Sequence, residues 1–478
     1  MTTRKDHYDL VVIGGGPAGL AGAITAGVLG KRVALIERSR HLGGALINTG
    51  TIPSKTLRET ALALSGLRSR QLHGVDLSLR RTARVADFLH HERAVKRGAR
   101  AEVAERLAHV GVEHLHGAAR FVGPHELELT VPRGRPRRLR ARRILIATGS
   151  RPTWPAEFPV GHPRVWDSDR ILELERLPRR LAVIGAGVIG SEYASTFRAL
   201  GAQVFLVDGR AQLFPFLDAE LARRLEAAMR AQGVEFRWNE RVVACAAPRR
   251  GPIRLELSSG AKLSVDAVLV AAGRRAAVEG LGLEAAGVEL DERGLIPVDR
   301  HFRTRVAHLH AAGDVVGFPA LASASAEQAR VAVCAAFGAR LKRELSAHYP
   351  SGIYTIPEAS TVGATEESLR AQGVDYVVGR AEYASNARGA IIGDRSGFLK
   401  LLFRRSDLRL LGAHLLGEQA IELVHVALMT MTCAGGAAEL ERACFNVPTL
   451  GNLYKEATYR ARIARDLPAA ARRLKRRR

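Results

Sequence analysis

Cysteine is scarce in this chain of 478 residues, and long apolar runs are missing. Cys245, Cys334, Cys433 and Cys444 show neither CxxC nor metal-ligand spacing, so we expect small core residues in a reducing cytoplasm and no metal site. The first apolar run is cut off by Gly14, which argues against a signal peptide, and no later run is long enough for a membrane span. The length instead predicts roughly three domains.

Acidic residues are also few: 48 Asp and Glu face 72 Lys and Arg, giving a formal net charge of +24. Such a charge favours anionic partners, and the terminal ARRLKRRR could contact nucleic acid or acidic lipid. Arginine is nevertheless spread over every region, and no aromatic residues interleave with the basic tail as single-strand binding surfaces prefer. We therefore expect neither nucleic acid nor a membrane as a partner.

A glycine motif lies near the N-terminus. Residues 9–37, DLVVIGGGPAGLAGAITAGVLGKRVALIE, predict a strand, a glycine turn, a helix and a second strand. Gly14 permits the turn, Gly16 lets backbone amides approach a pyrophosphate, and Gly19 allows close helix–strand packing. Glu37 at the end of the second strand can accept hydrogen bonds from a ribose. Together these features predict a dinucleotide-binding βαβ unit.

The same pattern returns without a gap at residues 181–208, LAVIGAGVIGSEYASTFRALGAQVFLVD. Two nucleotide units in one chain suit a flavin and a nicotinamide held together. In the second unit Asp208 should bind the ribose 2′-hydroxyl of NAD(H), whereas Arg210 could accept the 2′-phosphate of NADP(H). The repeated residues, each 171 positions after its counterpart in the first unit, are Gly185, Gly187, Gly190, Gly201 and Asp208.

Each unit closes with a similar apolar phrase, ILIATGSRP at 144–152 and VLVAAGRRA at 268–276. Such strands bring backbone close to a dinucleotide, which assigns Thr148 and Gly149 to the flavin and Gly273 to the nicotinamide. A charged helix is predicted over 85–109, followed by strand-like alternation to Leu139 that contains Gly117, a further flavin-site candidate.

The glycine motifs stop near Tyr354, where the pattern changes to alternating strands and helices. The run FLKLLFRRSDLRLLGAHLLG predicts a hairpin, and IELVHVALMTM predicts an apolar helix. A separate α+β unit is therefore expected at the C-terminal end of the chain.

The stretch 42–55, LGGALINTGTIPSK, resembles the redox loop of the flavin disulfide reductases, the dihydrolipoamide dehydrogenase-like family. In that loop two cysteines face the flavin, and their positions here hold Leu46 and Thr51, which cannot carry electrons. GTIPSK, EYAS, LKLLF and FNVPT are similar to the soluble, or Si-specific, pyridine nucleotide transhydrogenases. Those proteins usually keep a cysteine at the position of Leu46, so the chain resembles a divergent member.

The resemblance implies FAD beside Gly44 and Lys55, with Lys55 and Glu192 paired next to the flavin ring. Thr51 would offer the flavin a hydroxyl group. From spacing alone, Glu192 could equally be a first-turn acid that interacts with its own helix dipole.

The resemblance also implies a second flavin motif in HLHAAGDVVGFPALASASAEQARVAV, where Gly313 and Asp314 follow an apolar strand and Asp314 bonds the ribityl chain. An ordinary helix N-cap aspartate is the alternative interpretation. In CFNVPTLGNLYKEA, Val447 and Asn452 replace the histidine and glutamate that serve the dithiol in disulfide reductases. An acid/base pair serving a dithiol has no role once the dithiol is gone.

We therefore expect an α/β protein with two Rossmann-like domains, for FAD and NAD(P), and a C-terminal α+β dimerisation domain. The expected boundaries are 1–150 with 276–348, 151–275 and 349–466, followed by a basic tail at 467–478. A cytoplasmic homodimer of this kind would transfer hydride between NADPH and NAD⁺, with Lys55, Glu192 and Thr51 as catalytic residues. The alternatives are an NAD(P)H-dependent reductase of a quinone or other small acceptor and a catalytically silent FAD/NAD-binding protein.

Overall fold

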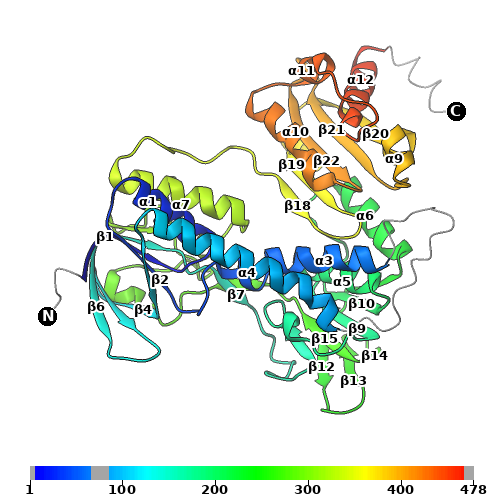
Figure 1. Cartoon of the computed structure of the whole chain (residues 1–478). Coiled ribbons are helices and arrows are strands. Elements are labelled where there is room, and N and C mark those ends of the chain that lie inside the picture. Colours follow the sequence, from blue (N-terminus) through cyan, green and yellow to red (C-terminus); the bar gives the residue numbers. More distant parts are fainter. Residues whose placement is uncertain (1–5, 66–84, 468–478) are drawn as a thin grey trace.

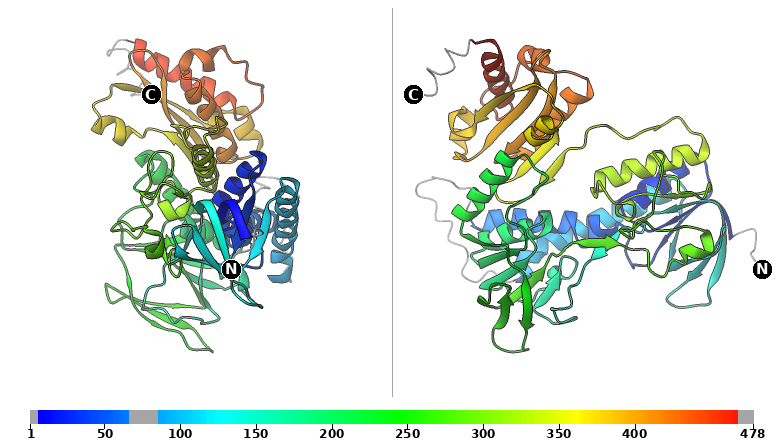
Figure 2. Two further views of the ribbon diagram at one scale, coloured as in Figure 1. Left: turned by 90° about the vertical axis from the view of Figure 1, so that its left-hand side faces the viewer. Right: turned by 180° about the vertical axis from the view of Figure 1, so that it is seen from behind.

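The computed structural model describes residues 6–65 and 85–467, which form three larger sheets with helices packed around them (Figure 1). The predicted basic tail lies outside these residues except for Leu467. The first sheet lies at one end of the molecule, and the second and C-terminal sheets lie at the other end, as the view from behind also shows (Figure 2). Within the described ranges, no helix is both long and apolar enough to cross a bilayer.

The first sheet has the order β3-β2-β1-β6-β5-β4, with β17 paired to β6. Strands β1, β2, β3, β6 and β17 pair in parallel, and β4 and β5 extend the sheet as antiparallel strands. Helices α1 and α7 pack against each other beside this sheet. The βαβ unit and the helix predicted at 85–109 are both confirmed. The elements are β1 (His7–Ile13), α1 (Pro17–Val28), β2 (Val33–Glu37), α4 (Val85–His109), β3 (Glu113–His116), β4 (Ala118–Gly123), β5 (Glu126–Thr130), β6 (Arg137–Ile146), β17 (Leu309–Ala311) and α7 (Ala322–Phe337).

The second sheet repeats the nucleotide-binding topology, with five parallel strands in the order β11-β10-β9-β15-β8. An antiparallel ladder of β12, β13 and β14 lies beside it, and a two-stranded ribbon of β7 and β16 connects it to the first sheet. The elements are β7 (Ser150–Pro152), β8 (Val165–Asp167), β9 (Arg180–Ile184), α5 (Val188–Ala199), β10 (Gln203–Asp208), α6 (Ala219–Ala231), β11 (Val234–Trp238), β12 (Val242–Ala246), β13 (Ile253–Leu257), β14 (Lys262–Val265), β15 (Ala267–Val270) and β16 (Arg274–Ala276).

The C-terminal sheet is antiparallel, in the order β18-β19-β22-β21-β20. The predicted hairpin is the β21–β22 pair, and the predicted apolar helix is α10, so both predictions are confirmed. The elements are β18 (Ser351–Ile353), β19 (Ala359–Gly363), α8 (Glu366–Ala371), β20 (Tyr376–Glu382), α9 (Ala387–Ile391), β21 (Phe398–Arg404), β22 (Leu410–Leu416), α10 (Ala420–Thr432), α11 (Ala437–Arg442) and α12 (Asn452–Asp466).

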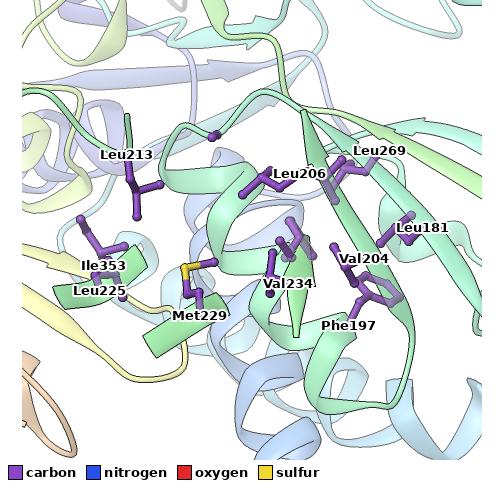
Figure 3. Close-up of a cluster of buried hydrophobic side chains, with 14 of the residues drawn as sticks. Leu181, Phe197, Val204, Leu206, Leu213, Leu225, Met229, Val234, Leu269 and Ile353 are labelled. Carbon is purple, nitrogen blue, oxygen red and sulfur yellow. The ribbon is translucent and has the colours of Figure 1, made fainter. Parts of the chain in front are cut away.

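Apolar packing joins the three parts. Helix α3 (Thr51–Ser65), which continues the loop at 42–50, packs along α5 of the second sheet. The close-up in Figure 3 shows Ile353 from β18 beside Leu225 and Met229 of α6, in the same buried cluster as the core strands β9 and β10. This packing places the loop, the second nucleotide unit and the start of the C-terminal sheet next to one another.

A buried ion cluster joins the second and third parts. The ammonium group of Lys400 in β21 is 1% exposed and lies 2.8 Å from Asp218 Oδ1 and 2.5 Å from Glu366 Oε1. Asp218 also caps the N-terminus of α6 by accepting a hydrogen bond from the Glu220 amide. Since a buried charge is costly without its partners, these contacts favour one relative placement of the two sheets.

Candidate dinucleotide and hydride-transfer site

Two glycines in each βαβ turn are required by the backbone itself. Gly14 and Gly185 adopt φ values of +105° and +103°, which L side chains rarely reach. A Cβ added at Gly19 would lie 1.7 Å from the Gly14 carbonyl oxygen, and one at Gly190 would lie 1.9 Å from the Gly185 oxygen. The tight turn and the close helix packing predicted for these positions are therefore present in both units.

The middle glycine of each motif faces open space instead. At Gly16 an added Cβ would have its nearest neighbour, the Cα of Gly44, at 3.8 Å, and at Gly187 nothing lies within 4 Å. Both glycines stand at the N-cap of a helix in extended conformation. Helix amides and open space at the same point fit a pyrophosphate group.

Two backbone amides hold the carboxylate at the end of the first unit in position. Glu37 accepts hydrogen bonds from the amides of Gly15 and Ser39, both at 2.7 Å. The carboxylate is thereby fixed at the carboxyl end of β2, the edge at which parallel sheets bind ligands.

Asp208 repeats these contacts in the second unit and adds an ion pair. It accepts from the Ala186 amide at 2.7 Å and the Arg210 amide at 2.8 Å. The Arg210 guanidinium donates two further bonds, at 2.9 and 2.7 Å. Burial alone would raise the pKa of Asp208, but these hydrogen bonds hold it below the ordinary value. The position that matches Arg210 in the first unit is Ser39, so the ion pair belongs to the second unit alone.

A cavity of about 490 Å³ lies along the first unit. The Thr148 hydroxyl in its wall is buried and has no hydrogen-bond partner among the described residues. An unsatisfied buried hydroxyl, an open glycine turn and a fixed carboxylate together fit a polar dinucleotide. The predicted residues that line the cavity are Gly14, Gly16, Glu37, Gly44, Thr51, Thr148, Gly149, Gly313 and Asp314.

Three predicted flavin-site residues are not among those that line the cavity. Gly19 packs under the turn, and Gly117 donates its amide to the Glu37 carbonyl at 2.9 Å. Lys55 lies one helical turn beyond Thr51, on the same face of α3. On the nicotinamide side, Gly273 follows β15 with φ +106° and open space around it.

Asp314 is not a helix N-cap, so that alternative is wrong. It begins a short 3-10 turn, Asp314–Val316, and α7 starts later, at Ala322. Its Oδ2 accepts a hydrogen bond from the Ser150 hydroxyl at 2.6 Å, and the Ser150 hydroxyl in turn accepts from Arg274 at 2.9 Å. The carboxylate is therefore positioned in the cavity wall by β7 and β16.

Lys55 and Glu192 meet where the three parts of the chain join. The Lys55 Nζ lies 2.5 Å from Glu192 Oε2, and the other carboxylate oxygen accepts the Tyr354 amide at 2.9 Å. The Lys55 ammonium also lies 4.7 Å from the centre of the Tyr354 ring. Glu192 is not in the first turn of α5, which excludes the helix-dipole alternative. One carboxylate thus links α3, α5 and the segment after β18.

The positions of the missing dithiol line the same cavity. Leu46 in α2 (Gly44–Asn48) is partly buried, and Thr51 at the start of α3 is exposed. Neither side chain can store electrons. The prediction that all four cysteines are core residues is wrong for two: Cys334 is buried and Cys245 half-buried, whereas Cys433 and Cys444 are exposed.

Val447 and Asn452 lie in the C-terminal part, beside a cavity of about 210 Å³ that Glu456 also lines. Val447 is 66% exposed and carries no titratable group. In the described chain these two residues therefore offer no acid/base pair.

Sequence reasoning missed several residues that the fold brings to the site. Arg100 of α4 lines the cavity and donates to Asn48 Oδ1 at 2.8 Å, and Asn48 in turn donates to the Leu42 carbonyl at 3.0 Å. Arg274 could have been found, because it follows Gly273 in a phrase already assigned to a nucleotide. Tyr354 and Arg100 belong to no motif, so no local pattern marks them.

Comparisons with known proteins agree with this geometry. Residues 8–333 match the model of the pyridine nucleotide-disulphide oxidoreductase family, and residues 349–458 match its dimerisation domain. The soluble pyridine nucleotide transhydrogenase of Mycobacterium bovis is 43% identical over 452 residues, covering 94% of this chain and 96% of the relative. The protein of the same name from Marinomonas is 40% identical, covering 96% and 98%.

Solved structures show the same fold. The HOCl-induced flavoprotein disulfide reductase RclA from Escherichia coli superposes with a TM-score of 0.85 at 29% identity, covering 95% of this chain and 99% of that one. LpdA from Mycobacterium tuberculosis gives 0.88 at 26% identity, covering 94% and 99%. The predicted architecture of two Rossmann-like domains and a C-terminal α+β domain is confirmed. The chain belongs to the pyridine nucleotide-disulphide oxidoreductase family, and within it to the soluble pyridine nucleotide transhydrogenases.

Proposed function

We propose that this protein transfers hydride between NADPH and NAD⁺ through bound FAD and uses no redox-active dithiol. One observation carries the proposal: the Lys55–Glu192 ion pair joins the loop at the first nucleotide unit to the second unit, while Leu46 and Thr51 occupy the dithiol positions. The parts needed for exchange between a nicotinamide and a flavin are present, and those needed to pass electrons on to a disulfide are not.

FAD supplies a ring that accepts hydride from one nicotinamide and returns it to another. The residues that would hold it are those of the cavity, with Gly16 at the pyrophosphate, Glu37 at a ribose and Asp314 at the ribityl chain. Thr148 would satisfy its buried hydroxyl there. Gly19 and Gly117 would not contact FAD directly. They would support the site through the backbone, Gly19 at the Gly14 carbonyl and Gly117 at the Glu37 carbonyl.

Lys55 would place a positive charge beside the ring, and its contact with Glu192 would hold that charge in position. Because Glu192 is largely buried and holds the ammonium at 2.5 Å, the charge has a fixed position. Thr51, one turn earlier on the same helix face, would donate a hydrogen bond from its hydroxyl group to the ring. These three residues position and stabilise, and none stores electrons.

We assign the FAD domain to residues 1–150 and 276–348, the NAD(P) domain to 151–275 and the dimerisation domain to 349–466. The ribbon of β7 and β16, which pairs Ser150 with Ala276, supports the two junctions between the nucleotide domains. The dimerisation domain supports a homodimer. A cytoplasmic location is proposed because the four cysteines form no disulfide in the structure.

Steady-state turnover tests the proposal. With NADPH as donor and thio-NAD⁺ as acceptor under anaerobic conditions, we expect a ping-pong pattern with parallel double-reciprocal lines, because donor and acceptor use one nicotinamide site in turn. Turnover with a quinone but not with thio-NAD⁺ would instead identify a reductase. FAD-loaded protein with no turnover would identify a silent binding protein.

Asp208→Asn should shift nicotinamide preference towards NADPH. The neutral amide no longer repels a 2′-phosphate and holds Arg210 less tightly, which frees the guanidinium for that phosphate. We expect the NADPH-to-NADH ratio of dissociation constants to fall by about tenfold. Arg210→Gln should change the ratio in the opposite direction. Unchanged ratios in both variants would remove Asp208 and Arg210 from the 2′-position.

A further inference from the structure

A second region of the first sheet combines positive charge with two open hollows. Two adjoining hollows of about 700 and 420 Å³ share Arg143, and we call them together the Arg143 groove. The groove lies at the amino-terminal ends of β1 and β17 and the carboxyl-terminal end of α7. The dinucleotide cavity lies at the opposite edge of the same sheet, where β1 leads into the glycine turn, so the two sites are distinct.

The first hollow is strongly basic. Lys31, Arg32, Arg140 and Arg142 line it with Arg143, and Asp9 is the one acid among its lining residues. Asp9 lies 3.5 Å from Arg142 and accepts the Arg32 amide at 3.0 Å. The residues that line this hollow therefore include five cationic side chains and one carboxylate.

The second hollow contains no Asp or Glu among its lining residues. Arg303 pairs with Asp299 at 3.3 Å and Lys342 with Glu327 at 2.9 Å, but neither acid lines the hollow. Arg340 and Arg343 also line the hollow, and both are exposed and have no ion pair among the described residues. Guanidinium groups that have no acidic partner at an open hollow favour an anion.

A buried histidine opens onto the second hollow. His310 in β17 is 3% exposed, and it lines this hollow. Burial, followed by the charge of Arg143, lowers the pKa of His310 to about 4, while Asp299 opposes the shift and Arg303 and His308 add to it. At neutral pH the ring is therefore uncharged and keeps one N–H to donate. A phosphate oxygen in the hollow could accept a hydrogen bond from that N–H group.

We propose that the Arg143 groove binds a multiply charged phosphate anion, a triphosphate chain or longer. A single phosphate would contact one hollow, whereas a chain of several phosphates can reach cations in both hollows on either side of Arg143. Planar guanidinium groups match phosphate oxygens bidentately. A nucleoside triphosphate and inorganic polyphosphate share this chemistry. The site is independent of hydride transfer.

Isothermal titration of the FAD-loaded, full-length protein with inorganic tripolyphosphate tests the site. The protein is first saturated with NAD⁺ so that the nicotinamide site is filled, and the ionic strength is physiological, where screening acts beyond about 8 Å. We expect two variants to weaken tripolyphosphate binding by at least about tenfold each. One is the double variant Arg340→Gln with Arg343→Gln, and the other is the single variant Arg143→Gln. The matched control is Arg249→Gln with Arg250→Gln, two exposed arginines in the turn between β12 and β13, which should leave binding unchanged.

Parallel titrations with ATP and with a single-stranded oligonucleotide identify the source of the phosphate. Equal binding of ATP and tripolyphosphate means that the phosphate chain alone is recognised, and tighter ATP binding means that a nucleoside contributes. Either result supports the site if the groove variants weaken it. Absence of tripolyphosphate binding, binding of the oligonucleotide alone, or equal weakening by the control pair would overturn the proposal.

Discussion

Replacing Gly16 with valine should give a folded but colourless protein. At Gly16 φ is −79° and ψ is −172°, a conformation that valine adopts readily, and an added Cβ meets no protein atom closer than 3.8 Å. The chain therefore has room for the added β-carbon. A branched group would instead fill the space in front of the helix amides, where the FAD pyrophosphate would bind. We expect FAD binding to weaken by at least about a hundredfold, roughly 3 kcal/mol.

The internal repeat supplies a matched control. Gly187 has φ −76° and ψ −179° with nothing within 4 Å, so Gly187→Val places the same side chain in the other unit. This variant should stay yellow and lose reduction by NADPH. Absorbance at 450 nm after gel filtration measures the retained FAD, and bleaching of that absorbance by NADPH measures its reduction. Thermal melting against FAD-free native protein shows whether each variant is folded. A yellow Gly16→Val protein with native FAD content would contradict the assignment of the first unit to FAD.

Glu192→Gln should slow reduction by NADPH by about a hundredfold while FAD is retained. The amide keeps the shape of the carboxylate but loses the charge that holds the Lys55 ammonium at 2.5 Å. A preorganised charge or donor beside reacting atoms contributes on the order of a hundredfold or more to the rate. Stopped-flow bleaching of the flavin absorbance at saturating NADPH measures the step directly.

Glu59→Gln is the control for this experiment. Glu59 lies on the same helix α3, but its carboxylate is 44% exposed and pairs with Arg58. Its replacement should leave the rate within about twofold of native, because exposed pairs contribute little. If Glu192→Gln and Glu59→Gln reduce at the same rate, the Lys55–Glu192 pair has no part in hydride transfer.

Much of the fold could be predicted because its determinants are local and repeated. Gly14, Gly19 and their counterparts 171 positions later are required by the turn and the helix packing, and the structure shows both requirements. The Lys55–Glu192 contact was predicted by resemblance, since residues 137 apart carry no local signal of proximity.

The rest of the site depends on packing between distant segments. Tyr354 reaches Glu192 because Ile353 of β18 packs against α6. Arg100 reaches the cavity because α4 packs against α2, which ends at Asn48. Sequence reasoning also missed the ion pair between Asp208 and Arg210. Both residues were assigned to the nicotinamide as independent groups, whereas two side-chain hydrogen bonds join them. Such contacts follow from side-chain geometry, which a motif does not contain.

Anaerobic titration of the purified FAD protein with NADPH tests the central claim most directly, because it counts the electrons that the protein accepts. Hydride exchange without a dithiol predicts two electrons per flavin, and the count should be the same after all four cysteines are replaced by serine. Uptake of four electrons per flavin in the native protein, falling to two in the serine variant, would show a redox-active cysteine pair and contradict the account.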